Sequence, residues 1–228
     1  MEEKDKLAVF DFCETLIQFQ TADAFINFVY EKTRSKRMRR IEKEKNLFYK
    51  LGIPRLLNRF SGMWEKKSLN KKWRLYELRG FGERELNELA RRFYHERLQP
   101  AFIEPVLSQL QDKKKEGYVV GIVSGGFDLY IRHFAADYGV DFILASTIGF
   151  KQGKCTGRLV GPDCMREQKV TEIQRLYPVP PEESLSYSDS FSDLPILLWA
   201  AKGVVVSRER HQQWIDHYKL DEIIWQQR

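Results

Sequence analysis

Short apolar runs alternate with stretches of helical periodicity over most of the chain. Strands that end in polar residues are predicted at Lys6–Phe12, Tyr118–Val123, Val140–Ala145, Ser184–Tyr187 and Gly203–Val206. Helices are predicted between them at Glu104–Glu116, Phe127–Tyr138, Arg166–Leu176 and Asp193–Ala201. This alternation favours the α/β class, with a Rossmann-like parallel sheet and helices on both of its faces.

The stretch after the first strand has a different, all-helical pattern. A first helix is expected from Thr21, which could serve as its N-cap, and the basic run from Lys32 to Lys50 shows no helix breaker. Further helices are predicted at residues 55–60, 66–78 and 84–98. We therefore expect a core domain of residues 1–16 and 101–228, and a helical cap of residues 17–100 over the carboxyl edge of the sheet.

A hairpin is predicted near the middle of the core. Ile148–Phe150 and Cys155–Val160 flank the segment KQGK, in which Gly153 can supply the turn. Cys155 and Cys164 are expected to pack in or near this hairpin.

Composition excludes several classes of protein. Hydrophobic residues make up 43% of the 228 residues and charged residues 31%, which is typical of a globular chain and not of a disordered one. No apolar run approaches the roughly 18 residues of a membrane span, and the charged start MEEKDK does not resemble a signal peptide. The 3 cysteines form no CxxC pair, so a reducing, cytoplasmic location is expected.

The net charge of +6 is unevenly distributed. The segment Lys32–Arg74 holds 16 Lys and Arg residues against 3 Asp and Glu residues. Such a segment can bind an anionic ligand or can be a solvated helix face, and composition does not choose between the two. Nucleic acid is an unlikely partner because no aromatic-interleaved motif accompanies the charge.

Three segments that end predicted strands carry polar groups suited to phosphate chemistry. Asp11 follows the first strand, Ser124-Gly125-Gly126 follows the second, and Asp189 and Asp193 follow the strand at Ser184–Tyr187. Ligands gather at the carboxyl ends of parallel strands. Carboxylates brought together there need a cation, and oxygen ligands favour Mg²⁺. A Ser-Gly-Gly turn offers a hydroxyl and backbone N–H groups to an anion.

These residues resemble the ordered motifs of the haloacid dehalogenase (HAD) superfamily. The matching segments are Asp11-Phe12-Cys13-Glu14-Thr15-Leu16, Ser124-Gly125-Gly126, Lys169 and Asp189-Ser190-Phe191-Ser192-Asp193. With the segment from Thr156 to Val170, they are similar to the phosphoserine-phosphatase-like branch, which carries a helical cap after the first strand. The resemblance covers residues 6–206.

The resemblance implies a role for each matching residue. Asp11 would attack phosphorus and form an aspartyl phosphate. Mg²⁺ would be held by the carboxylates of Asp11 and Asp189 and the main-chain carbonyl of Cys13, with Asp193 in support.

Further residues would bind the transferring group. Ser124 and the N–H of Gly125 would hold phosphate oxygens, and Lys169 would add positive charge. Lys169 is only one of several candidate lysines, because Lys151 and Lys154 are near in sequence. Thr15 would brace the nucleophile loop, and Gln20 falls at the substrate-binding position.

Two positions depart from the family pattern. Cys13 stands where phosphatases of the superfamily carry an Asp that protonates the leaving oxygen, an effect worth about 10²–10⁴ in rate. Glu14 could serve instead only if the loop turned it inward, because neighbouring residues of an extended chain point to opposite faces. Gln20 stands where phosphoserine phosphatases carry an acidic residue that pairs with the substrate's ammonium group.

The sequence therefore predicts a Mg²⁺-dependent phosphatase that acts on a small organic phosphate monoester through an aspartyl phosphate. Two alternatives stay open because of Cys13. One is a phosphotransferase or another HAD-type hydrolase with altered acid/base chemistry. The other is a catalytically weak HAD scaffold that binds an anionic partner through its basic cap.

Overall fold

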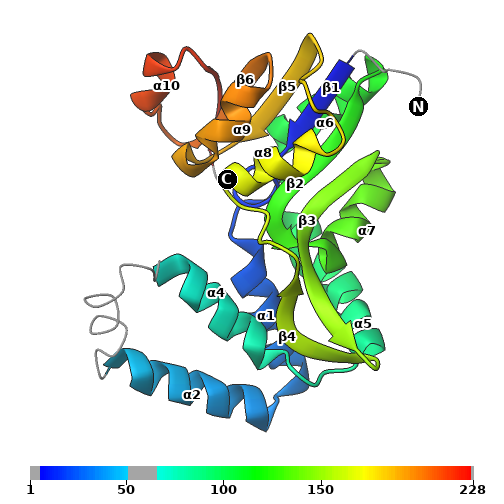
Figure 1. Cartoon of the computed structure of the whole chain (residues 1–228), viewed down its shortest axis with the longest axis vertical. Coiled ribbons are helices and arrows are strands. Elements are labelled where there is room, and N and C mark those ends of the chain that lie inside the picture. Colours follow the sequence, from blue (N-terminus) through cyan, green and yellow to red (C-terminus); the bar gives the residue numbers. More distant parts are fainter. Residues whose placement is uncertain (1–5, 51–65, 227–228) are drawn as a thin grey trace.

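The computed structural model describes residues 6–50 and 66–226. The described residues form a seven-stranded sheet in the order β4-β3-β2-β1-β5-β6-β7, with β4 antiparallel to β3 and every other pair parallel (Figure 1). This arrangement confirms the predicted α/β class. The strands are β1 Lys6–Phe10, β2 Val119–Phe127, β3 Phe142–Lys151, β4 Lys154–Val160, β5 Glu183–Ser188, β6 Lys202–Arg208 and β7 Asp221–Trp225.

Alternate residues of the central strand face opposite layers of helices. Ala8 and Phe10 pack in one hydrophobic cluster with α6 (Glu104–Lys115) and α7 (Asp128–Tyr138). Leu7 and Val9 pack in a second cluster with Ile173 of α8 (Glu167–Gln174) and Ile196 of α9 (Leu194–Trp199). Because side chains of a strand alternate between faces, this run of apolar residues fills both layers.

The helical segment that follows β1 contains α1 (Thr21–Thr33), α2 (Lys36–Lys50), α4 (Lys66–Glu77) and α5 (Glu83–Phe93). A π-helical turn, η1 (Tyr94–Leu98), and a 3₁₀ turn, η2 (Gln99–Ala101), lead back to the core. The helix predicted at residues 55–60 lies outside the described residues.

The prediction of an unbroken helix through the basic run was wrong. Arg34 has a left-handed φ of 50° and its N–H bonds to the Tyr30 carbonyl, which ends α1. The Ser35 hydroxyl then accepts a hydrogen bond from the Met38 N–H at 3.3 Å, as an N-cap does. Ser35, a residue type that favours the N-cap position, therefore marks the start of a second helix within the basic run.

The hairpin forms as predicted, but its first strand is longer. The two predicted strands at 140–145 and 148–150 form one continuous strand, β3, whose far half pairs with β4. The hairpin also packs against the helical segment, because Cys155 exchanges backbone hydrogen bonds with Gly80 and Phe81 at 2.7 and 2.9 Å. The helical segment and the hairpin therefore lie together at one end of the molecule (Figure 1).

Two further differences concern the core. Strand β2 continues through the Ser-Gly-Gly segment to Phe127, with a register shift between Ser124 and Phe127, so the segment is a bulged strand end rather than a turn outside the sheet. The structure adds α10 (Trp214–His217) and edge strand β7, which the sequence patterns did not predict. None of the described helices is long and apolar enough to cross a membrane.

Candidate active site

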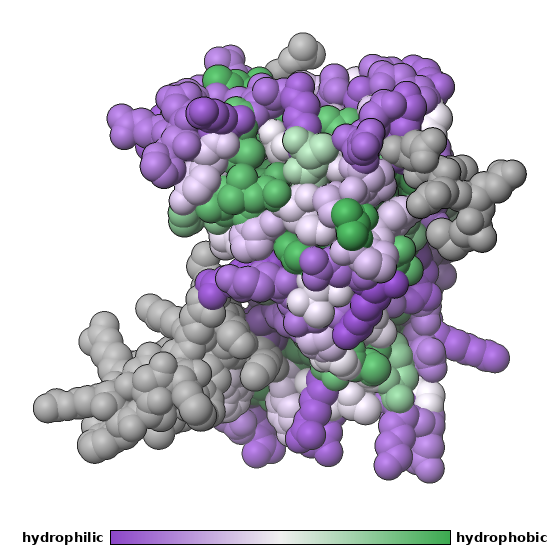
Figure 2. Space-filling model, turned by 45° about the horizontal axis from the view of Figure 1, so that its top comes forward, coloured by the Kyte–Doolittle hydropathy of each residue, from purple (hydrophilic) through white to green (hydrophobic). Residues whose placement is uncertain are grey.

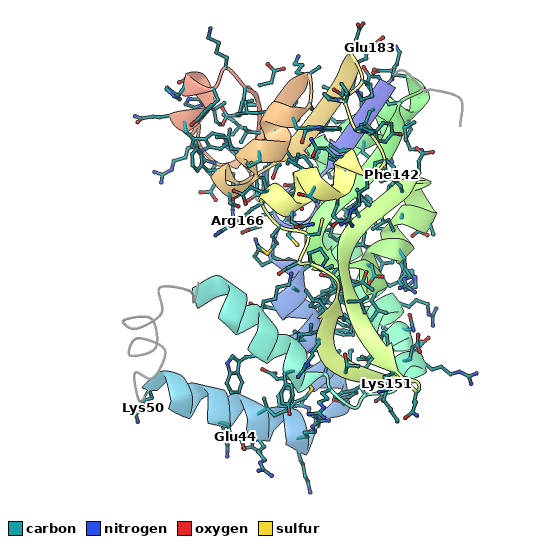
Figure 3. All side chains as sticks on the ribbon, in the orientation of Figure 1. Glu44, Lys50, Phe142, Lys151, Arg166 and Glu183 are labelled. Carbon is teal, nitrogen blue, oxygen red and sulfur yellow. The ribbon has the colours of Figure 1, made fainter. Side chains whose placement is uncertain are left out.

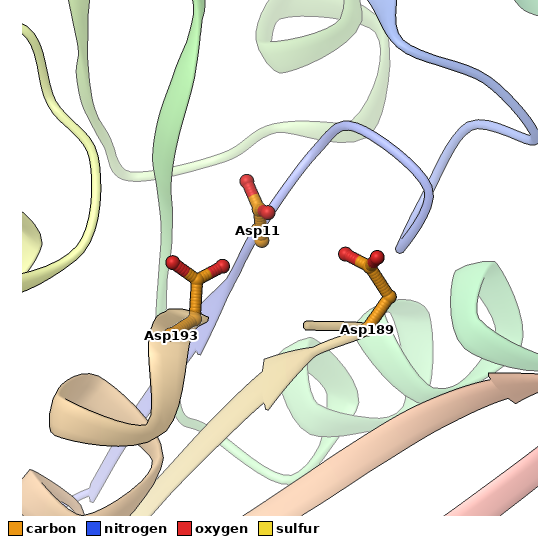
Figure 4. Close-up of side chains that lie close together, drawn as sticks. All are labelled: Asp11, Asp189 and Asp193. Carbon is orange, nitrogen blue, oxygen red and sulfur yellow. The ribbon is translucent and has the colours of Figure 1, made fainter. Parts of the chain in front are cut away.

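Three carboxylates converge at the carboxyl edge of the sheet. Asp11 follows β1, Asp189 follows β5, and Asp193 directly precedes α9. One oxygen of each lies within 4.8 Å of the others, and their side chains point toward one another (Figure 4). Neighbouring parallel strands β1 and β5 end side by side, which is why residues 178 positions apart meet here.

Lys169 of α8 joins this cluster. Its Nζ lies 3.0 Å from Asp11 Oδ2 and 2.7 Å from Asp193 Oδ2, and the residue is 2% exposed. Asp193 also accepts a hydrogen bond from the Ser188 hydroxyl at 2.6 Å, and its side chain makes no N-cap bond to α9. The other two candidate lysines, Lys151 and Lys154, flank the turn of the hairpin. Figure 3 shows Lys151 at the opposite end of the molecule from Glu183, the first residue of β5.

Ser124, Gly125 and Gly126 form the bulged end of β2 beside Asp11, and we call this segment the anion turn. Ser124 is fully buried, and its Oγ accepts the Gly126 N–H at 3.1 Å. Its own proton therefore remains for an acceptor on the other side, and a hydrogen bond from Ser124 acts to lower the pKa of Asp11. The turn thus supplies a hydroxyl donor next to the candidate nucleophile.

A cavity of about 520 Å³ opens above the three carboxylates. Its walls combine the nucleophile loop, the anion turn, α8 and residues of the helical segment. The lining side chains with polar groups include Asp11, Cys13, Glu14, Gln20, Asp23, Lys71, Ser124, Asp163, Arg166, Lys169, Asp189 and Asp193.

Thr15 was expected to brace the nucleophile loop, and the structure places it behind Asp189. It is fully buried and is not among the residues that line the cavity. Its hydroxyl donates to Asp189 Oδ1 at 3.1 Å, so it holds Asp189 from behind. Gln20 does line the cavity, and its amide donates to the Glu14 carboxylate.

The electrostatics of the cluster favour a bound cation. Burial raises the pKa of Asp11, with the Asp193 charge acting in the same direction against Lys169. Burial, together with the charges of Asp11 and Glu14, raises the pKa of half-buried Asp189 to about 8. Lys169 pairs with Asp11 and Asp193 and not with Asp189, so ionisation of all three carboxyls leaves negative charge that an oxygen-preferring divalent ion fits.

Cys13 lines the cavity but is held as a neutral thiol. Burial and the Asp11 charge raise the pKa of Cys13 to about 11. Its Sγ lies 2.9 Å from Thr21 Oγ1, which lies 2.6 Å from the Tyr130 hydroxyl. Tyr130 in turn accepts the Phe127 N–H at 2.9 Å.

The prediction that Thr21 could be the N-cap of α1 was wrong. Thr21 is the first residue of the helix, its hydroxyl lies in the core, and Gln20 is the N-cap.

Glu14 contradicts the expectation that it would point away from Cys13. Its φ is 57°, so the loop is not extended there, and both side chains line the same cavity. The Glu14 carboxylate therefore lies in the same cavity as Cys13, which replaces the acid/base Asp of the family.

Among the residues that the structure describes, the helical segment brings one cation to the cavity. Figure 2 shows mainly hydrophilic side chains projecting from the bottom of the molecule. Of the described lysines and arginines of the helical segment, Lys71 alone lines the cavity. Arg74 is instead buried against Glu77 and Asn27. Sequence reasoning missed Lys71, and also Arg166, which lies on the side of the core that faces α4 (Figure 3).

Comparisons with known proteins agree with this geometry. A family model for haloacid dehalogenase-like hydrolases matches residues 8–198. Phosphoserine phosphatase of Methanocaldococcus jannaschii is 25% identical over 232 residues, which cover 98% of this chain and 98% of that protein.

Two solved structures share the fold. A protein of unknown function from Bordetella pertussis Tohama I gives a TM-score of 0.76 at 17% identity, over 96% of this chain and 97% of that one. A substrate-bound phosphoserine phosphatase complex gives a TM-score of 0.61 at 21% identity, over 98% of this chain and 94% of that one. The family match spans all four motifs, and the chain therefore belongs to the haloacid dehalogenase-like hydrolases, where it resembles the phosphoserine-phosphatase-like branch.

Proposed function

We propose that the protein is a Mg²⁺-dependent phosphatase that acts on a small organic phosphate monoester through an aspartyl phosphate at Asp11. The observation that carries this proposal is the convergence of Asp11, Asp189 and Asp193 within 4.8 Å, beside Lys169 and the anion turn. A nucleophile, a cation site and phosphate donors within one cavity are the parts that phosphoryl transfer needs.

The residues of the chain divide the work of the first displacement. Asp11 attacks phosphorus, a new P–O bond forms to its carboxylate, the ester P–O bond breaks, and the leaving oxygen takes a proton from solvent water and departs as the alcohol. Lys169 and the Ser124 hydroxyl bind the non-bridging oxygens as negative charge moves onto them. Water then attacks the aspartyl phosphate, which releases inorganic phosphate and restores Asp11.

The donor set fits Mg²⁺. The carboxylates of Asp11 and Asp189 and the main-chain carbonyl of Cys13 would hold the ion, with Asp193 in support. A bound Mg²⁺ lowers the repulsion between the carboxylate nucleophile and the anionic substrate.

The substrate class follows from the size and polarity of the cavity. A volume of about 520 Å³ lies within the range of small-molecule sites. Gln20, engaged with Glu14, offers no full charge to an ammonium group, so phosphoserine is a poorer candidate than a phosphate ester without an ammonium group.

A panel of phosphate monoesters that includes phosphoserine tests the proposal. With Mg²⁺, at least one ester should release inorganic phosphate, and a chelator should stop the release until Mg²⁺ is restored. Release that persists unchanged in excess chelator would contradict metal dependence. A panel without turnover at any Mg²⁺ concentration would contradict the phosphatase.

Phosphoryl transfer to an acceptor other than water is a second candidate, which Cys13 favours. A thiol with a pKa of about 11 does not replace a carboxylate as the base that activates water. An aspartyl phosphate would then persist until an alcohol acceptor arrives. With a labelled phosphate donor, label retained on the protein and passed to an added alcohol faster than to water supports transfer.

Mg²⁺ affinity is expected to increase with pH up to about pH 8. Asp189, with a pKa of about 8 in the metal-free protein, must lose its proton before it binds the ion. Below that pH, affinity should fall about tenfold per pH unit. Between its ordinary pKa of 3.8 and about 8, the folded metal-free protein holds a proton that the unfolded chain has lost. Its free energy of unfolding should therefore fall as pH rises through this window.

Calorimetric titration with Mg²⁺ in buffers of different ionisation enthalpy measures both the affinity and the released proton. Asp189→Asn is the matched variant. Its residual Mg²⁺ binding should be weak and should not vary with pH in this range. An affinity that is flat from about pH 6 to about pH 8 would show that Asp189 is already ionised.

A further inference from the structure

Lys71 connects the helical segment to the core at the rim of the cavity. It belongs to α4, and its side chain is 15% exposed. Its Nζ donates to the Gly125 carbonyl at 2.7 Å, lies 3.4 Å from the Ser146 hydroxyl, and pairs with the Asp163 carboxylate. One ammonium group thus contacts three core segments that are distant in sequence.

The contact with Gly125 holds one end of a particular peptide group. The Gly125 carbonyl and the Gly126 N–H belong to the same peptide, and the N–H donates to Ser124 Oγ at 3.1 Å. Lys71 fixes the oxygen end of this peptide and Ser124 fixes the nitrogen end. Ser124 Oγ accepts on that side, and its hydroxyl faces Cys13 Sγ at 4.0 Å and the Asp11 carboxylate, both of which line the cavity.

The charge of Lys71 is already matched. Asp163 pairs with it and also accepts the Ser146 hydroxyl at 2.6 Å, and Ser146 in turn accepts the Cys164 N–H at 3.3 Å. Ser146 is fully buried. These bonds fix the ammonium on the turn instead of leaving it as a free charge for substrate.

We propose that Lys71 is a positioning residue for the reaction, which orients the anion turn so that the Ser124 hydroxyl and the Gly125 N–H meet the phosphate. The α4 helix must lie against the core for this contact to form, so the helical segment completes the phosphate site through its contact with the turn. The inference rests on the proposed phosphatase function for its effect on turnover. The part of the inference that concerns the conformation of the anion turn does not depend on the proposed function.

Lys71→Met keeps most of the aliphatic stem and removes the ammonium. We expect the Gly126 amide to exchange with solvent deuterium about tenfold faster, because the peptide loses its carbonyl partner. We also expect inorganic phosphate, in the presence of Mg²⁺, to bind about tenfold more weakly, with a matching fall in kcat for any ester that the panel identifies. Lys71→Arg should recover part of each effect.

Lys36→Met is the matched control, because Lys36 is an exposed lysine of α2 and should change none of these quantities. Unchanged exchange at Gly126 in Lys71→Met would overturn the proposal. Faster exchange with unchanged phosphate affinity would overturn it too, because the turn would then be loosened without consequence for the anion. A natural protein that binds no phosphate and turns over no ester contradicts the proposed function instead, and the exchange measurement still tests the contact.

Discussion

Asp11→Asn is expected to lower the rate of phosphate release by at least about 10³-fold. The amide has nearly the same shape as the carboxylate but cannot attack phosphorus, so no aspartyl phosphate forms. The substitution also removes a partner of Lys169, whose Nζ lies 3.0 Å from Asp11. Steady-state release of inorganic phosphate from the best ester of the panel measures the loss. Mass spectrometry of acid-quenched natural protein should locate the phosphate on the peptide that contains Asp11.

Asp112→Asn is a suitable control for this experiment. Asp112 pairs with Lys115 on α6 and its side chain is 50% exposed, so the same chemical change there should leave turnover intact. Melting temperatures of both variants check that each is folded. A folded Asp11→Asn protein that keeps most of its turnover would exclude Asp11 as the nucleophile, and with it the covalent route.

Cys13→Asp is expected to raise the rate of hydrolysis by about 10²-fold. The thiol of Cys13, with a pKa of about 11, is neutral at physiological pH and is a weak acid toward a leaving oxygen. An Asp carboxyl at the same point of the cavity could protonate the leaving group and then accept a proton from water. Thr21 Oγ1, 2.9 Å from the sulfur, is placed to donate a hydrogen bond to the new carboxylate. Comparison of kcat for the two proteins on one ester measures the gain.

Cys13→Ser separates the effect of a carboxylate from that of a smaller polar side chain, and it should bring no gain. If Cys13→Asp folds but is no faster than Cys13→Ser, another group already supplies the proton. Glu14 is then the first to examine, because it lines the same cavity. In that case Glu14→Gln should reduce turnover in the natural background. A large gain from Cys13→Asp on a natural protein that barely turns over would favour phosphoryl transfer or a binding role.

Much of the core could be predicted because its signals are local. The run Lys6–Phe12 is apolar on both faces, as a central parallel strand must be, and Asp11 near its end marks the carboxyl edge. Asp189 and the Ser-Gly-Gly segment occupy the corresponding positions on other strands. Parallel strands bring such ends to one edge whatever the distance in sequence. The convergence of the carboxylates and the anion turn therefore follows from strand order.

Other features depend on contacts that no local pattern encodes. The sequence offered Lys151, Lys154 and Lys169 as candidate partners of the carboxylates, and only packing of α8 against the sheet selects Lys169. The composition of the basic run left open whether its charges bind a ligand or face solvent, and in the folded chain Lys71 alone of the described cations of the helical segment lines the cavity.

The sequence by itself determined the α/β class and the identity of the residues at the sheet edge, because periodicity and motif order act over a few neighbouring positions. The tertiary structure decided the environment of Cys13, the inward turn of Glu14 and the link from Lys71 to the anion turn. Each of these depends on side chains that meet from distant segments, or on a single backbone angle, and such geometry is fixed only when the whole core packs.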